Sequence, residues 1–127
     1  MKTLTKEEIL AAQDLKTETV DVPEWGGQVI VRTMTGLERD RFESSIMQGG
    51  QRNYENLRSK VVVSTVVDAE GNSLFTLKDV EALGKKAANV IDRVFTVAIR
   101  LSGMTGKEME ELAGNSSTGP SDASTSD

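Results

Sequence analysis

Residues 85–102 read KKAANVIDRVFTVAIRLS and form the longest regular segment of the chain. Apolar side chains would fill most of the circumference of a helix built from this segment. Its polar residues recur at intervals of three and four, which places them on one narrow stripe of an α-helix; they are Asn89, Asp92, Arg93, Thr96 and Arg100. A helix that is apolar around most of its circumference lies at the centre of a core or contacts a second molecule.

Four further helices are predicted from threonines that are followed, three residues later, by an acidic residue. In this capping box each side chain accepts a hydrogen bond from a free backbone N–H of the other residue. The pairs are Thr5 with Glu8, Thr35 with Glu38, Thr76 with Asp79, and Thr105 with Glu108. They predict helices over residues 5–12, about 35–48, 76–84 and 105–113.

The helix predicted over residues 35–48 has a recognisable apolar side. Leu37, Phe42 and Ile46 are expected to form its buried face, with charged residues on the opposite face. Residues 54–67 are harder to assign, because their valines favour a strand by propensity whereas their length favours a helix. We predict a helix for this segment.

A β-hairpin is predicted at about residues 18–33. Two runs rich in valine flank a turn that contains Gly26-Gly27, and this dipeptide permits the backbone angles of a tight reversal. Strand alternation would place Ile30 on the face opposite Val29 and Val31, so that both faces carry apolar side chains. The hairpin would then be buried on two sides, or Ile30 would be an isolated exposed residue of an edge strand, which is common.

Trp25 lies at the predicted tip of the hairpin and is the only tryptophan of the chain. Tryptophan is enriched among the residues that dominate binding energy at interfaces. A tryptophan at this place equally suits a lid that folds back over a small core. The candidate partner contacts are therefore drawn from the hairpin and the long helix: Trp25, Ile30, Val90, Val97 and Leu101.

The composition excludes several kinds of site. The 127 residues include no cysteine and no histidine, which removes disulfides, thiolate metal sites and the commonest general base. Carboxylates such as Glu7-Glu8 fall in the first turns of predicted helices, where negative charge offsets the helix dipole. We therefore predict a protein that is not an enzyme and that needs no cofactor or metal.

The charge and the hydropathy pattern also limit the partners. The net charge is −5, whereas nucleic-acid binders usually carry a basic face that neutralises phosphates. The N-terminus has no apolar signal segment, and no apolar run is long enough to span a bilayer. We expect no nucleic-acid or membrane partner, and a place in the cytoplasm.

The expected fold class is α+β and mostly α. A helical domain over residues 1–113 would contain the one hairpin. Residues 114–127 are rich in Ser, Thr and Gly and cannot bury apolar surface, so we expect them to form a disordered tail.

The order of several segments is similar to that of a known family. They are residues 1–10 (MKTLTKEEIL), 20–27 (VDVPEWGG), 35–40 (TGLERD), 66–75 (VVDAEGNSLF) and 100–105 (RLSGMT). Over about residues 1–113 the chain resembles the tail assembly chaperones of siphophages with HK97-like tails.

The resemblance implies a non-enzymatic assembly protein of the host cell cytoplasm. Proteins of that family bind the long, helical tape measure protein, keep it soluble, help to recruit tail tube subunits around it, and are absent from the mature virion. Many are made in two lengths, the longer by a ribosomal frameshift, and this chain would be the short form. Tube recruitment would then use the long form. Self-association through the hairpin and the long helix is a further expectation from the residues themselves.

Three other functions remain open at this point. The runner-up is a structural phage protein, such as a connector or a tail completion subunit that stays in the virion. A small regulator that binds nucleic acid comes third, because the basic face is missing. An enzyme ranks last.

The short-form interpretation predicts a slippery heptanucleotide, of the form X XXY YYZ, near the end of the folded part. Gly114 and Asn115 can be encoded as GGA followed by AAC or AAT, and Ala113 as GCG, so the message would contain G GGA AAC or G GGA AAT. A shift at this junction keeps the helical domain and replaces only the tail. The nucleotide sequence tests the prediction: a codon other than GGA for Gly114, or one for Ala113 that does not end in G, rules out the site.

Overall fold

The helix α5 (Ala88–Leu101) lies at the centre of the computed structural model, which describes residues 1–104. Its buried side chains are Val90, Ile91, Val94, Phe95 and Ala98. They belong to one hydrophobic core that α5 shares with helix α3 (Leu57–Thr65) and with the first two strands. Of the two outcomes expected for this segment, the structure shows a central place in the core.

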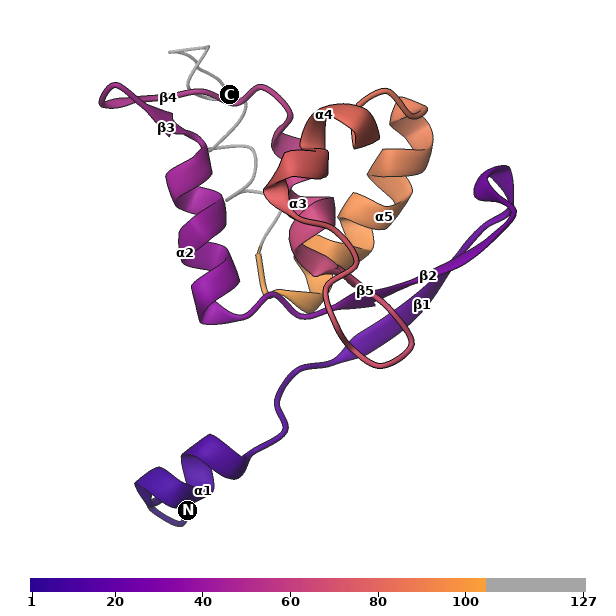
Figure 1. The fold of residues 1–127 in the computed structure, drawn as a ribbon. Helices are drawn as coiled ribbons and strands as arrows, with labels where there is room; N and C mark the ends of the chain where they lie inside the picture. Colours follow the sequence, from indigo (N-terminus) through magenta and orange to yellow (C-terminus); the bar gives the residue numbers. More distant parts are fainter. Residues whose placement is uncertain (105–127) are drawn as a thin grey trace, which may run out of the picture.

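The predicted hairpin forms and is part of a larger sheet. Strand β1 (Thr17–Val22) pairs antiparallel with β2 (Gly27–Arg32), and the short helix η1 (Pro23–Trp25) makes the turn between them. Gly26 completes the reversal with a φ of 83°, in the left-handed region that glycine adopts without strain. On its other side β2 pairs antiparallel with β5 (Val66–Val67), which gives the strand order β1-β2-β5 (Figure 1).

The segment predicted to be helical over residues 54–67 is a helix only as far as Thr65. The chain then becomes extended, and Val66 lies opposite Val31 in the sheet. A two-residue strand cannot be recognised from local pattern, because it is specified by its pairing with β2 rather than by its own neighbours. Thr65 is fully buried at the end of α3, where its hydroxyl donates a hydrogen bond to the carbonyl of Val61 at 2.9 Å.

The two faces of the sheet differ in what they carry. The face that turns toward the helices holds Val20, Val22, Val31 and Val66, all of them buried in the core that includes α5. We call these four residues the valine face. Ile30 points to the opposite face and remains half-exposed, so the hairpin is not buried on both sides.

Helix α2 (Gly36–Ser45) begins with the predicted capping box, since the backbone N–H of Glu38 donates to the hydroxyl of Thr35 at 3.1 Å. Phe42 and Ile46 are buried, but the prediction that Leu37 shares their face is wrong, because its side chain is 58% exposed. Five residues separate Leu37 from Phe42, which corresponds to about 140° of helical rotation. Met34, just before the helix, is buried in its place.

Short elements complete the body of the molecule. Strands β3 (Met47–Gln48) and β4 (Gln51–Arg52) form a small hairpin around two glycines that was not predicted. The helix predicted from Thr76 consists of η2 (Leu77–Asp79) and α4 (Val80–Leu83), and its capping box is present.

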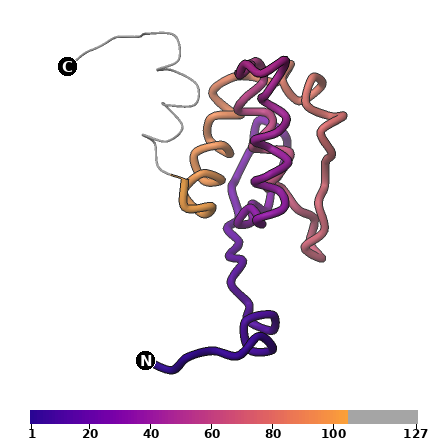
Figure 2. Tube along the Cα trace, turned by 90° about the vertical axis from the view of Figure 1, so that its left-hand side faces the viewer, coloured from indigo at the N-terminus to yellow at the C-terminus, as the bar shows by residue number. Residues whose placement is uncertain are grey.

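The first helix, α1 (Lys6–Ala11), also has its predicted capping box, but it lies apart from the body in both views (Figures 1 and 2). No helix within residues 1–104 is long and apolar enough to cross a lipid bilayer. The helix predicted over residues 105–113 and the tail at 114–127 lie outside the described residues.

The contrast between Phe42 and Leu37 gives a direct test of the core. Phe42→Ala should lower the free energy of unfolding by about 3–5 kcal/mol, because it removes a fully buried ring and leaves a cavity. Leu37→Ala, on the same helix, should change it by no more than about 0.5 kcal/mol, because that side chain is mostly in water. Urea unfolding followed by circular dichroism measures both. Equal losses for the two variants would contradict the packing of α2.

Candidate binding surfaces

The polar stripe of α5 binds neighbouring elements through its charged residues. Arg93 donates two hydrogen bonds to Glu24 in the hairpin turn, at 2.9 and 2.7 Å, and one to the carbonyl of Asp21 at 3.3 Å. Arg100 contacts both carboxylate oxygens of Glu18 on β1 at 2.8 Å. These pairs fasten the hairpin to α5 along the outer edge of β1, so the stripe is an internal attachment as well as a solvated face.

The pair of Arg93 and Glu24 changes the acidity of the carboxylate. The two-point hydrogen bonding from Arg93, helped by a backbone N–H in the turn, lowers the pKa of Glu24 from 4.5 to about 2. Both side chains are more than one-third exposed, at 37% for Arg93 and 43% for Glu24. Water and salt therefore screen the attraction between the two charges. The pair contributes mainly by fixing the orientation of the turn.

The five candidate contacts predicted from the sequence do not form one surface. Val90 is only 2% exposed, so it is a core residue and offers no surface to a partner. Val97 and Leu101 are half-buried on α5 and pack against the core. Ile30 is half-exposed on the opposite face of the sheet from the valine face, so the sheet separates it from α5.

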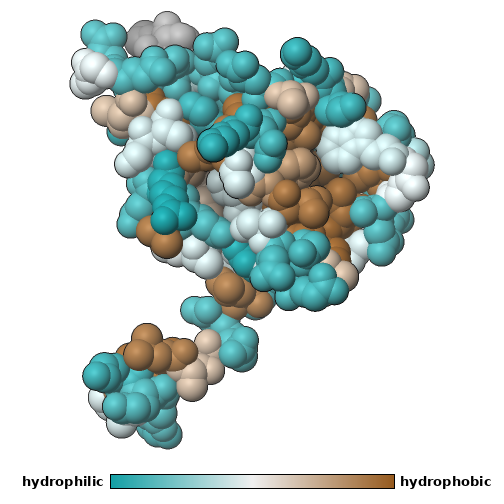
Figure 3. Space-filling model, viewed as in Figure 1, coloured by the Kyte–Doolittle hydropathy of each residue, from teal (hydrophilic) through white to brown (hydrophobic). Residues whose placement is uncertain are grey.

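Of the two roles left open for Trp25, the structure shows the lid, whereas the partner contact stays a prediction. Its half-buried side chain packs against the core, as a lid would, and it also forms one wall of a cavity of about 240 Å³. The other lining residues come from the loop after β5, from η2 and α4, and from the segment between α4 and α5: Phe75, Asp79, Ala82, Leu83 and Lys86. We call this cavity the apolar pocket. Figure 3 shows hydrophobic residues gathered in the hollow between the hairpin and the helices.

The apolar pocket was only partly visible in the sequence. Trp25 was singled out as a candidate contact, but Phe75 and Leu83 were not, although Phe75 follows a polar turn directly after Leu74. Leu74 and Leu77, on either side of Phe75 in the chain, are 53% and 43% exposed. The apolar surface therefore extends beyond the pocket itself.

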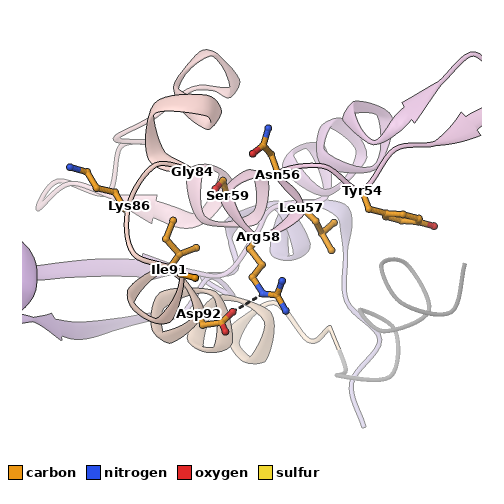
Figure 4. A pocket seen from close by; sticks show the side chains of 10 residues that line it. Tyr54, Asn56, Leu57, Arg58, Ser59, Gly84, Lys86, Ile91 and Asp92 are labelled. Atoms are coloured by element: carbon orange, nitrogen blue, oxygen red, sulfur yellow. Dashed lines mark ion pairs between the residues drawn. The ribbon is translucent and has the colours of Figure 1, made fainter. Parts of the chain in front are cut away.

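A larger and more polar cavity, of about 510 Å³, lies where α3 and α5 begin (Figure 4). Arg58 crosses it to pair with Asp92 at 2.6 Å, and the guanidinium also lies over the ring of Phe95, 5.4 Å from its centre. Asn56 lies directly before α3 and has a φ of 63°. Its side-chain oxygen lies so near Gly84 that a Cβ at position 84 would be only 3.1 Å away. Arg58 and Asp92 thus neutralise each other inside this cavity, and their ion pair joins α3 to α5.

Among residues 1–104, no group of three or more Asp and Glu side chains is placed to hold a metal ion. The surfaces that this part of the chain offers are apolar hollows and ion pairs. Such features are suited to binding other proteins.

Comparison with known proteins gives a family match and a structural match. A family model described as phage tail assembly chaperone matches residues 5–115. A solved structure, "Structure of bacteriophage HK97 tail assembly chaperone", aligns with a TM-score of 0.55 and 21% sequence identity, over 75% of this chain and 90% of that chain. At that identity the second match concerns the fold. Among curated protein sequences, none matches the chain.

The titration of Glu24 tests the attachment of the hairpin. Its side-chain carboxyl carbon, followed by NMR, should titrate with a midpoint near the pKa of about 2 instead of 4.5. Because the folded-state pKa is lowered, the stability that the pair contributes is present above about pH 4.5 and is lost as the pH falls toward 2. Arg93→Gln should return the midpoint toward 4.5. A native midpoint near 4.5 would show that the pair does not form in solution.

Proposed function

The chain belongs to the phage tail assembly chaperone family, and on that premise we propose that it binds the tape measure protein and keeps it soluble while the tail is built. The observation that carries the proposal is the family match over residues 5–115, which includes the whole folded body. Assembly takes place in the host cell. We place the protein in the host cytoplasm, expect it to be absent from the mature virion, and assign it to a siphovirus.

The physical features of the body support this proposal. A tape measure protein would expose apolar helical stripes until the tube covers it, and an apolar helix is commonly bound in a groove by a few anchoring side chains. The half-exposed and exposed apolar residues beside the closed core supply such anchors: Trp25, Ile30, Phe75, Val97 and Leu101. The net charge of −5 favours solubility of a complex that carries apolar surface.

The remaining partners follow from the same premise. We propose that the recruitment of tail tube subunits belongs to a longer frameshifted product, and that copies of the chain also associate with one another. Binding rather than catalysis is the proposed mode of action, in keeping with the description of the family as chaperones.

Co-expression with the tape measure protein of the same phage tests the proposal. The chain should keep the tape measure soluble and co-purify with it. Ile30→Asp and Trp25→Ala should each weaken the complex by about tenfold to a hundredfold, because burial of a large apolar side chain is worth about 1.5–3 kcal/mol. Gln28→Asp is the matched control, since it adds the same charge on the same face of the same strand and should have little effect.

The possible outcomes distinguish the proposed function from the proposed binding residues. If the native chain neither solubilises nor binds the tape measure, the proposed function is wrong. If it does so and both variants bind normally, the function stands but these residues do not form the contact. Mass spectrometry of purified virions separates a chaperone from a connector or tail completion protein, because the latter would remain in the particle.

A further inference from the structure

The N-terminal arm, residues 1–16, exposes apolar side chains that the rest of the described chain does not cover. The arm projects from the body at the start of β1, and α1 lies well away from every other element in two perpendicular views (Figures 1 and 2). None of the residues of α1 is buried. Ile9 is 56% exposed and Leu10 is 77% exposed. These two residues would gain from burial against an apolar surface.

The sequence nevertheless contains specific signals that make α1 a helix. The backbone N–H of Thr5 donates to the carboxylate of Glu8 at 2.9 Å, and the N–H of Glu8 donates back to the hydroxyl of Thr5 at 3.2 Å. Leu4 and Ile9 occupy the two positions, just before the cap and four residues after it, whose side chains pair in a hydrophobic staple. A helix of six residues is marginal in water even with good caps, so this one requires a docking surface to be stable.

The apolar pocket offers a surface of matching chemistry. Its walls include Trp25, Phe75 and Leu83, and its volume of about 240 Å³ suits one or two branched aliphatic side chains. The charged residues that line the pocket are one acid, Asp79, and one base, Lys86, so the match with the arm rests on the apolar side chains.

The course of the chain favours docking on a second copy. Strand β1 leads from Thr17 away from the arm, and Trp25 lies beyond the far end of that strand. The strand is about 20 Å long, and the five residues 12–16 that link it to α1 span at most about 18 Å. Docking on its own pocket would require this linker to reverse and run back along the whole strand. A neighbouring molecule needs no such reversal.

We propose that, when no tape measure protein is bound, the N-terminal arm of one copy docks, through Ile9 and Leu10, in the apolar pocket of a second copy. This contact deepens the self-association proposed above: one side lies at the hairpin turn, and the other is the arm instead of the long helix. The experiment below measures the association of copies in the absence of the tape measure. This contact can therefore be disproved while the proposed function stands, and the proposed function can be disproved while this contact stands.

Sedimentation of the full-length chain tests each side of the contact. The native chain should associate with increasing concentration. Two substitutions should each raise the apparent dissociation constant by about tenfold or more: Leu10→Asp on the arm and Ala82→Lys at the pocket. Ala82 is an exposed residue of α4 that lines the pocket. The matched controls are Gln13→Asp in the linker and Glu81→Lys next to the pocket, which should change it by less than about twofold.

Mixing the two defective variants gives the sharper test. Leu10→Asp retains an intact pocket and Ala82→Lys retains an intact arm, so each alone should be monomeric and their mixture should form a one-to-one heterodimer. Because the chain has no cysteine, single cysteines at Leu10 of one copy and Ala82 of another should also cross-link between molecules. A monomeric native chain, native-like association of either variant, or variants that are monomeric both alone and mixed would each overturn the proposal.

Discussion

The packing of α5 between α3 and the valine face of the sheet is the constraint on which the rest of the structure depends. Val94 and Ala98 on α5 are fully buried, as are Val22 and Val31 on the strands. A two-stranded hairpin alone is marginal in water. It becomes stable here because α5 covers its apolar face and because β5 adds a third strand at the end of α3.

The same arrangement decides which parts of the surface can bind partners. Arg93 and Arg100 use the polar stripe of α5 to hold the hairpin turn and the outer strand, so this stripe is engaged within the molecule. Open apolar surface lies elsewhere, and includes the hollow lined by Trp25 and Phe75, Ile30 on the far face of the sheet, and the arm. A protein of this family can thus keep a closed core and still present apolar side chains to others.

The sequence was sufficient wherever the structure is specified by residues close together in the chain. The capping boxes at Thr5, Thr35 and Thr76 formed as predicted, because each joins residues three positions apart. The hairpin also formed as predicted, and Gly26 in its turn has the positive φ that a tight reversal uses. The mostly helical fold class and the family resemblance were also confirmed.

What the sequence could not give depends on tertiary contacts. The strand β5 exists only through its pairing with β2, across the whole of α2 and α3. The buried position of Val90 could not be separated from a partner contact, because an apolar helix does not reveal which of its sides another element will cover. The apolar pocket likewise brings together a hairpin turn, a loop and a short helix, and none of the three marks it alone.

The central claim is that the core around α5 stays closed while partners bind outside it. Hydrogen exchange of the full-length chain, free and in complex with the tape measure protein, measures this most directly. The account predicts that the amides of α5 are among the slowest to exchange in both states, and that new protection appears outside α5, in the strand that carries Ile30. Faster exchange of α5 in the complex would contradict it, because the core would then open to present its apolar helix to the partner.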